Sequence, residues 1–88
     1  MLRAFVLIQV EAGQGSRVSE EVSRLDDVIA TAVVTGPYDV IAHAEASSID
    51  ELGRSVLRPI QGIEGVIRAM TCPVLQRGEP KRPELLRV

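Results

Sequence analysis

VIATAVVTGPYDVIAHAEA, residues 28–46, consists of two apolar runs separated by Gly36-Pro37. Residues 28–35 are rich in β-branched side chains, which favour a strand. Proline fixes φ and donates no N–H, so the run breaks there. From Asp39 to Ala46 small apolar residues occupy every second position, the period of a strand with one buried face. We predict a hairpin of two strands over residues 28–35 and 39–46.

A strand and a helix precede this hairpin. Residues 2–10 are nearly all apolar and end at the Gly-containing segment 11–15, which is typical of a strand followed by a loop. Apolar side chains then recur at helical spacing at positions 18, 22 and 25, and Ser16 is a candidate N-cap. We predict a helix over residues 17–25.

A second helix and a fourth strand follow the hairpin. Ser48-Ile49-Asp50-Glu51 has the pattern of a capping box, and it predicts a helix over residues 49–57 that Pro59 ends. After a Gly-containing turn, residues 66–75 form a predicted strand. Pro73 within it suits a strand end or an edge strand.

The order strand, helix, strand, strand, helix, strand predicts the fold class α+β, a ferredoxin-like βαββαβ sandwich. Its antiparallel four-stranded sheet is expected to carry two helices on one face. At 88 residues the chain has room for one core, so we assign residues 1–75 to one domain and residues 76–88 to a C-terminal extension. Because the strand at residues 2–10 is apolar on both faces, we expect a partner subunit to cover the second face.

The composition is that of a globular protein, with 45% hydrophobic and 25% charged residues. A formal net charge of −2 argues against direct DNA binding, because phosphate contacts draw on clustered Lys and Arg. The single cysteine excludes an internal disulfide and suits a reducing compartment. The apolar run at residues 5–8 is too short to cross a membrane and no signal peptide is recognisable, so we expect a cytoplasmic protein without a membrane partner.

Chemically reactive side chains are few. His43 and Cys72 are the one histidine and the one cysteine of the sequence, and together they compose no catalytic triad or metal-ligand cluster. We expect His43 to be a packing or interface residue and Cys72 to be inert and largely buried. The sequence therefore predicts a protein that is not an enzyme and that has no cofactor and no metal.

Three segments of the sequence are fairly specific in combination. They are Val33-Val34-Thr35-Gly36-Pro37-Tyr38-Asp39, Ile49-Asp50-Glu51-Leu52, and Ile63-Glu64-Gly65-Val66 followed by Thr71. With them the chain resembles, from about Leu2 to Leu75, the ligand-binding domain of the Lrp/AsnC (feast/famine) transcription regulators, also called the RAM domain. Because the sequence begins directly with the first predicted strand, it is similar to the stand-alone form without a helix-turn-helix.

The resemblance implies a dimer packed sheet to sheet, a dimeric α/β barrel, and rings of such dimers with an amino acid bound between them. It places Thr35, Gly36, Tyr38, Asp39, Thr71 and Cys72 at this ligand site. Asp39 suits the ammonium group of a free amino acid, whereas the Thr71 hydroxyl and the N–H groups near Gly36 suit its carboxylate. Pro37 departs from the family pattern and removes one N–H donor.

Three functions stay open on the sequence alone. The first is a non-catalytic domain that senses an amino acid and modulates transcription by assembling with full-length Lrp/AsnC regulators. The second is a small enzyme on the same dimeric α/β barrel, monooxygenase- or isomerase-like, with His43 as proton acceptor. The third is a purely structural partner in the rings of other regulators. We favour the first, because it uses the hairpin motif and needs no catalytic machinery.

Overall fold

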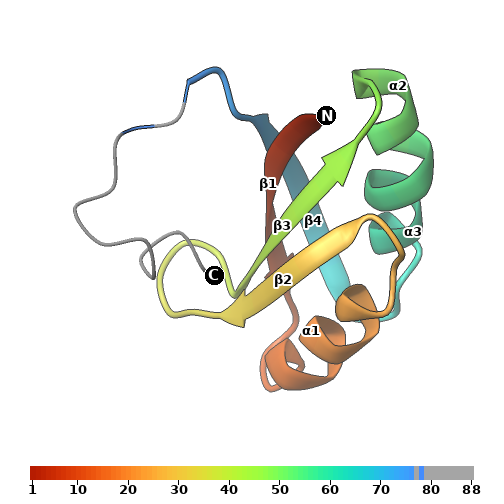
Figure 1. Ribbon diagram of the computed structural model, residues 1–88. Helices are drawn as coiled ribbons and strands as arrows, with labels where there is room; N and C mark the ends of the chain where they lie inside the picture. Colours follow the sequence, from red (N-terminus) through yellow and green to blue (C-terminus); the bar gives the residue numbers. More distant parts are fainter. Residues whose placement is uncertain (77, 79–88) are drawn as a thin grey trace.

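A computed structural model describes residues 1–76 and 78. Its elements are, in chain order, β1 (Leu2–Val10), α1 (Gly15–Ser23), β2 (Val28–Val33), β3 (Val40–Ala46), α2 (Ile49–Leu52), the π-helical turn η1 (Gly53–Leu57), α3 (Arg58–Gln61) and β4 (Val66–Pro73). Because α2, η1 and α3 follow one another without a break, they form one helical segment (Figure 1). The predicted ferredoxin-like α+β fold is confirmed. Of the predicted extension, residues 77 and 79–88 lie outside the described residues.

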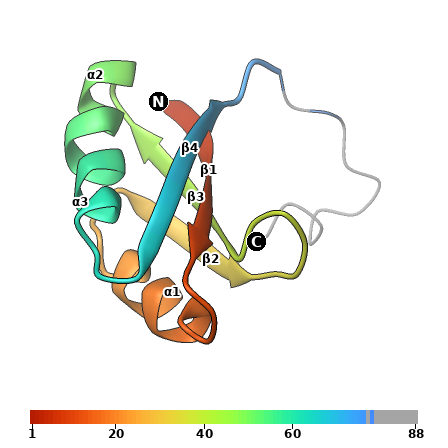
Figure 2. The same ribbon diagram turned by 180° about the vertical axis from the view of Figure 1, so that it is seen from behind.

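The strands of the described residues form one antiparallel sheet in the order β2-β3-β1-β4. α1 and the α2–α3 segment cover the same face of this sheet, as Figure 2 shows from behind. No helix of the described residues lies on the other face, which we call the open face. By strand register its side chains are Arg3, Phe5, Leu7, Gln9, Ala30, Ala32, Ile41, His43, Glu45, Arg68, Met70 and Cys72.

The core lies between the sheet and the helices. Every second residue of β1 and β3 is buried there: Ala4, Val6, Ile8, Val10, Val40, Ala42, Ala44 and Ala46. These side chains pack against Val18 and Val22 of α1 and against Leu52, Val56 and Ile60 of the α2–α3 segment. The two spacings are those of a strand and of a helix with one apolar face. The core of the described residues is therefore aliphatic, and the aromatic side chains of Phe5 and Tyr38 lie outside it.

The second helical segment runs further than predicted. The N-cap half of the predicted capping box is confirmed at its start, where the Ser48 hydroxyl accepts a hydrogen bond of 3.1 Å from the Glu51 N–H. The reciprocal bond from the Ser48 N–H is not formed in the described residues, because the Glu51 carboxylate accepts from Arg54 instead. The prediction that Pro59 ends the helix was wrong, since α3 includes Pro59. In a regular α-helix a proline ring clashes with the carbonyl four residues earlier. Here the preceding turn is π-helical, with the Arg58 N–H donating to the Gly53 carbonyl, and this wider turn gives the ring room.

Other element ends differ by one or two residues from the prediction. α1 begins and ends two residues earlier, because Gln14 and not Ser16 occupies the N-cap position. β2 and β3 stop short of the hairpin, since residues 34–39 leave the strand pairing and form a loop. β4 ends at Pro73, and beyond it the Val74 N–H still donates to the Arg3 carbonyl at 2.8 Å. None of these changes alters the order of the elements.

Candidate functional site

Asp39 fastens the hairpin loop, residues 34–39, to β1. Its N–H donates to the Ile8 carbonyl at 2.9 Å, and its carbonyl accepts from the Val34 N–H at 2.9 Å. Its carboxylate Oδ2 accepts a hydrogen bond of 2.8 Å from the Val10 N–H. The loop is therefore held at the end of the sheet where β1 stops.

The Val10 N–H needs this acceptor because β1 runs beyond its pairing with β3. The register of the two strands ends at Ile8 and Val40, and the pairing of β1 with β4 shifts between Gln9 and Val10. A backbone N–H without an acceptor costs free energy when it is shielded from water. Asp39 thus has a structural task, and its second carboxylate oxygen accepts from no donor of the described residues.

The tip of the loop faces solvent. Thr35, Gly36 and Pro37 are exposed, and the N–H groups of Thr35 and Gly36 donate no hydrogen bond within residues 1–76 and 78. Gly36 has φ of +141°, a backbone conformation that L side chains rarely adopt. The exposed tip therefore holds two N–H donors that have no hydrogen-bond acceptor among the described residues.

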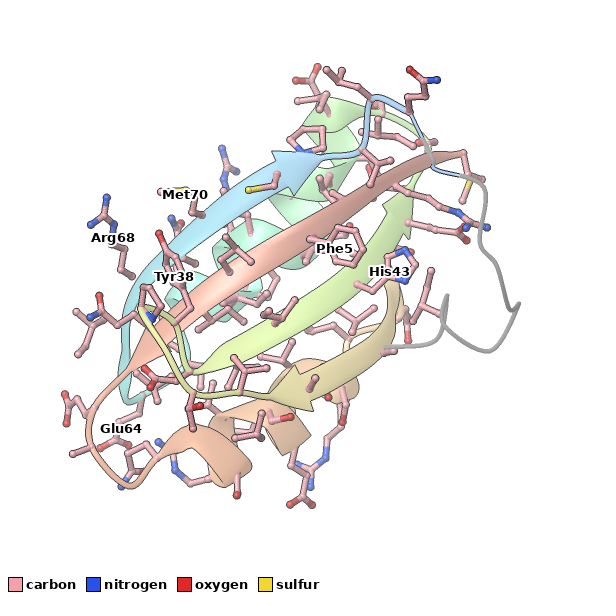
Figure 3. The ribbon with its side chains drawn as sticks, turned by 90° about the vertical axis from the view of Figure 1, so that its left-hand side faces the viewer. Phe5, Tyr38, His43, Glu64, Arg68 and Met70 are labelled. Atoms are coloured by element: carbon pink, nitrogen blue, oxygen red, sulfur yellow. The ribbon has the colours of Figure 1, made fainter. Side chains whose placement is uncertain are left out.

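Tyr38 crosses β1 and reaches β4. Its hydroxyl lies 3.8 Å from the Met70 sulfur, although β1 separates β3 from β4 in the sheet. Figure 3 shows Tyr38 lying over the open face beside Met70 and Arg68. The phenol thereby joins the hairpin loop to the open face of β4.

Thr71 and Cys72 lie on opposite faces of the sheet. Thr71 is in register with Val6, which is in the core, so its side chain faces the helices. Its hydroxyl is buried and has no hydrogen-bond partner among the described residues. Cys72 is in register with Phe5 on the open face, and it is exposed in the chain, not buried as expected. The structure therefore brings Thr35, Gly36, Tyr38 and Asp39 together on one loop and separates Thr71 from them by the sheet.

The middle of the open face is occupied by an aromatic pair. The rings of Phe5 and His43 are stacked, with centroids 4.9 Å apart and planes 19° from parallel, as Figure 3 shows. One residue pair further along, Arg3 Nε lies 2.6 Å from Glu45 Oε2. His43 is thus packed at the centre of the face and lies away from the hairpin loop.

Sequence reasoning missed three side chains at the loop end of the open face, namely Gln9, Arg68 and Met70. Gln9 is in register with Arg68, and Leu7 is in register with Met70. Residues 66–73 show no clear alternation of polar and apolar side chains, so the sequence did not indicate which of them share a face with Tyr38. Which side chains of β4 share the face of Tyr38 depends on the pairing of β4 with β1. This pairing shifts by one residue between Gln9 and Val10.

Other groups of the described residues are remote from the loop. A depression lined by Arg24, Leu25, Asp26, Asp27, Glu51 and Ser55 lies at the start of β2, whereas the loop follows its end. No group of three or more His, Cys, Asp or Glu is placed to hold a metal ion in this part of the chain. No described helix is long and apolar enough to cross a membrane.

This geometry defines the class of the protein: a ferredoxin-like α+β domain whose hairpin loop is fastened at one end of the open face, which no helix of the described residues covers. The model of the Lrp/AsnC ligand binding domain matches residues 3–83, and the chain belongs to this family.

Named relatives are transcriptional regulators. The chain is 31% identical over 71 residues to an uncharacterized HTH-type transcriptional regulator of Pyrococcus horikoshii, PH1916, and the match covers 77% of this chain and 47% of that protein. It is 30% identical over 64 residues to the HTH-type transcriptional regulator FL11 of Pyrococcus furiosus, covering 70% of this chain and 42% of that protein. The chain thus spans about half the length of the curated relatives that it matches.

Solved structures share the fold. TTHA0845 from Thermus thermophilus is 31% identical with a TM-score of 0.82, over 91% of this chain and 100% of that chain. AsnC of E. coli is 24% identical with a TM-score of 0.81, over 92% of this chain and 55% of that one. A transcriptional regulator of Neisseria meningitidis, NMB0573, solved as a complex with L-Met, is 21% identical with a TM-score of 0.75, over 90% of this chain and 53% of that one.

Proposed function

We propose that this domain senses a free amino acid, which binds at the loop end of the open face where subunits meet, and that it modulates transcription by assembling with full-length Lrp/AsnC regulators. The observation that carries the proposal is the hairpin loop that Asp39 fastens to β1, with Tyr38 laid over the open face. The loop is held in place while its exposed tip makes no contact that a ligand must first break. Such pre-organisation reduces the entropy cost of binding.

Assembly through the open face is the first part of the proposal. Phe5, Leu7, Ile41 and Met70 form an apolar surface there that no other element of the described residues covers. An apolar sheet face is stabilised by burial against a second layer. A second copy of the chain is the occupant that we propose, because one face packed on its own copy forms a closed two-fold interface. Rings of such dimers follow from the family resemblance.

Ligand chemistry is the second part. A free amino acid is a zwitterion, so its site needs an acceptor for the ammonium group and donors for the carboxylate. The second oxygen of the Asp39 carboxylate suits the ammonium group, and the N–H groups of Thr35 and Gly36 suit the carboxylate. The L-Met complex of NMB0573 supports an amino acid as the ligand class. The sequence-based assignment of Thr71 and Cys72 to the same site stays a prediction.

A non-catalytic role is the third part. Relatives of the chain carry names of transcriptional regulators, and His43 is packed against Phe5 in the middle of the open face. A domain that changes its assembly with an amino acid and associates with regulators that read DNA needs no reactive side chain.

Calorimetric titration of the assembled protein with each of the twenty amino acids tests the proposal, with native mass spectrometry before and after each addition. We expect at least one amino acid to bind and to change the mass of the assembly. Asp39→Asn keeps an oxygen acceptor for the Val10 N–H and removes the charge, so it weakens this binding without unfolding the loop. A wild-type protein that binds none of the twenty overturns the proposal and favours a purely structural partner.

A further inference from the structure

We propose that the Arg68 guanidinium on β4 receives the carboxylate of the effector. This inference rests on the proposed function and adds to it a binding residue and a requirement for the ligand, namely a free α-carboxylate. Arg68 is not among the residues to which the family resemblance or the sequence pattern assigned a role. The role of Arg68 is inferred from the register of β4 and from the charged side chains around Arg68.

Strand register places Arg68 at the loop end of the open face. Arg68 lies opposite Gln9 of β1, and Met70, two residues further along the same face, lies opposite Leu7. Residues two apart on one strand face are separated by about 7 Å. Since the Tyr38 hydroxyl lies 3.8 Å from the Met70 sulfur, Arg68 and Tyr38 flank the same small area (Figure 3).

Arg68 is a cation without a partner in the described part of the chain. It is exposed and makes neither an ion pair nor a hydrogen bond there. At the other end of the same face, by contrast, Arg3 is paired with Glu45. A guanidinium is unpaired at little cost only while water solvates it. When a second copy covers the open face, the charge needs an anion.

Within one copy of the chain, no carboxylate of the described residues forms an ion pair with Arg68. The Asp39 carboxylate is held by the Val10 N–H. Figure 3 shows Glu64 apart from Arg68, on the side of α1, where the neighbouring Arg17 donates to its backbone carbonyl. The Thr71 hydroxyl, the predicted carboxylate donor, faces the helices. Among the described residues at this end of the open face, Arg68 is therefore the donor that is both charged and open to a ligand.

A carboxylate fits the chemistry of the area better than a neutral group. Guanidinium and carboxylate meet through two parallel N–H···O hydrogen bonds, which set orientation as well as affinity. The Gln9 amide and the Tyr38 hydroxyl are neutral neighbours that can donate to the same anion. An amino acid bound in this way presents its ammonium group to the Asp39 carboxylate, and Arg68 takes the ligand carboxylate in place of the Thr35 and Gly36 N–H groups.

Titration of Arg68→Gln and of Arg58→Gln tests the assignment. Arg58 is a matched control, because it is an exposed arginine on α3 that is also unpaired in residues 1–76 and 78. Each protein is titrated with the twenty amino acids and with the α-amide of the one that binds best. We expect the wild type to prefer the acid over its amide by about tenfold to a hundredfold, from the strength of a charge-assisted hydrogen bond. Arg68→Gln loses this preference, and Arg58→Gln keeps it.

The outcomes separate the two proposals. If the wild type binds no amino acid, the proposed function fails and the role of Arg68 fails with it. If the wild type binds and Arg68→Gln binds equally well, or if the wild type binds acid and amide alike, the role of Arg68 alone fails. Arg68→Lys keeps the charge and loses the paired geometry, so an affinity between those of wild type and Arg68→Gln supports the assignment even where Arg68→Gln assembles poorly.

Discussion

The Asp39 carboxylate accepts a hydrogen bond of 2.8 Å from the backbone N–H of Val10. This bond ties the loop between β2 and β3 to the end of β1, which the loop does not adjoin in sequence. A residue that the sequence predicts to be a ligand contact is therefore also part of the framework that positions the proposed ligand site. Substitutions at Asp39 must therefore distinguish its hydrogen bond to Val10 from its proposed contact with the ligand.

We expect Asp39→Ala to lower the free energy of unfolding by about 1–3 kcal/mol, because the Val10 N–H loses its acceptor. Asp39→Asn retains an oxygen acceptor and is expected to stay within about 0.5 kcal/mol of the wild type. Urea denaturation followed by circular dichroism measures both. Equal stability of the two variants would show that this hydrogen bond does not hold the loop.

Leu7 tests assembly through the open face. We expect Leu7→Glu to reduce the proposed oligomer to monomers, since it places a charge in the middle of the apolar surface that a second copy is proposed to cover. Ile49→Glu is the control, because Ile49 is an apolar residue that is 56% exposed at the start of α2, in the helical layer. Native mass spectrometry distinguishes the two. If Leu7→Glu forms an oligomer of the same mass as the wild type, the proposed interface is contradicted.

Thr71 and Thr31 form a contrasting pair of hydroxyls on the helix side of the sheet. The Thr71 hydroxyl is buried without a hydrogen bond in the described residues, whereas the Ser19 hydroxyl bonds to that of Thr31 at 3.0 Å. We expect Thr71→Val to leave stability unchanged or to raise it by about 1 kcal/mol, and Thr31→Val to lower it by about 1–3 kcal/mol by leaving Ser19 unpaired. Thermal denaturation gives both values. A loss of amino-acid affinity in Thr71→Val would instead support the sequence-based role of this hydroxyl.

Gly65 and Gly53 respond oppositely to an added methyl group. Gly65 has φ of +95°, and a Cβ there would lie 2.7 Å from Arg17 Nη2, so Gly65→Ala is expected to cost about 1–3 kcal/mol. Gly53 has helical dihedral angles, and an added Cβ would meet no atom within 4 Å apart from its chain neighbours and the backbone of its own helix. Gly53→Ala is expected to stabilise the protein by about 0.4–1 kcal/mol. Urea denaturation of both variants under the same conditions measures these changes in the free energy of unfolding. A Gly65→Ala variant as stable as the wild type would contradict the expected strain at that turn.

Local patterns predicted much of the fold. The alternation of β3, the capping box at Ser48 and the spacing of Val18 and Val22 each depend on residues a few positions apart. The family resemblance drew on the segment around Tyr38 and Asp39 and is confirmed by the match to residues 3–83. Pro59 was misread, because a proline signals a helix end locally while a π-helical turn before it removes the conflict.

The candidate site was predicted only in part, because its members meet across strands. Tyr38 and Asp39 were placed together by being neighbours in sequence. Their partners, Met70 and Val10, lie on β4 and β1, and no periodicity within the loop points to them. Arg68 was overlooked for the same reason.

From the sequence by itself came the order of the elements, the aliphatic core and the family, because each follows from side chains that are close along the chain. The tertiary structure alone decided that Thr71 faces the helices while Arg68 shares a face with Tyr38. The physical reason is that successive strand residues point to opposite faces, so a shift of one residue in pairing exchanges the two sets. Between Gln9 and Val10 the pairing of β1 with β4 makes such a shift.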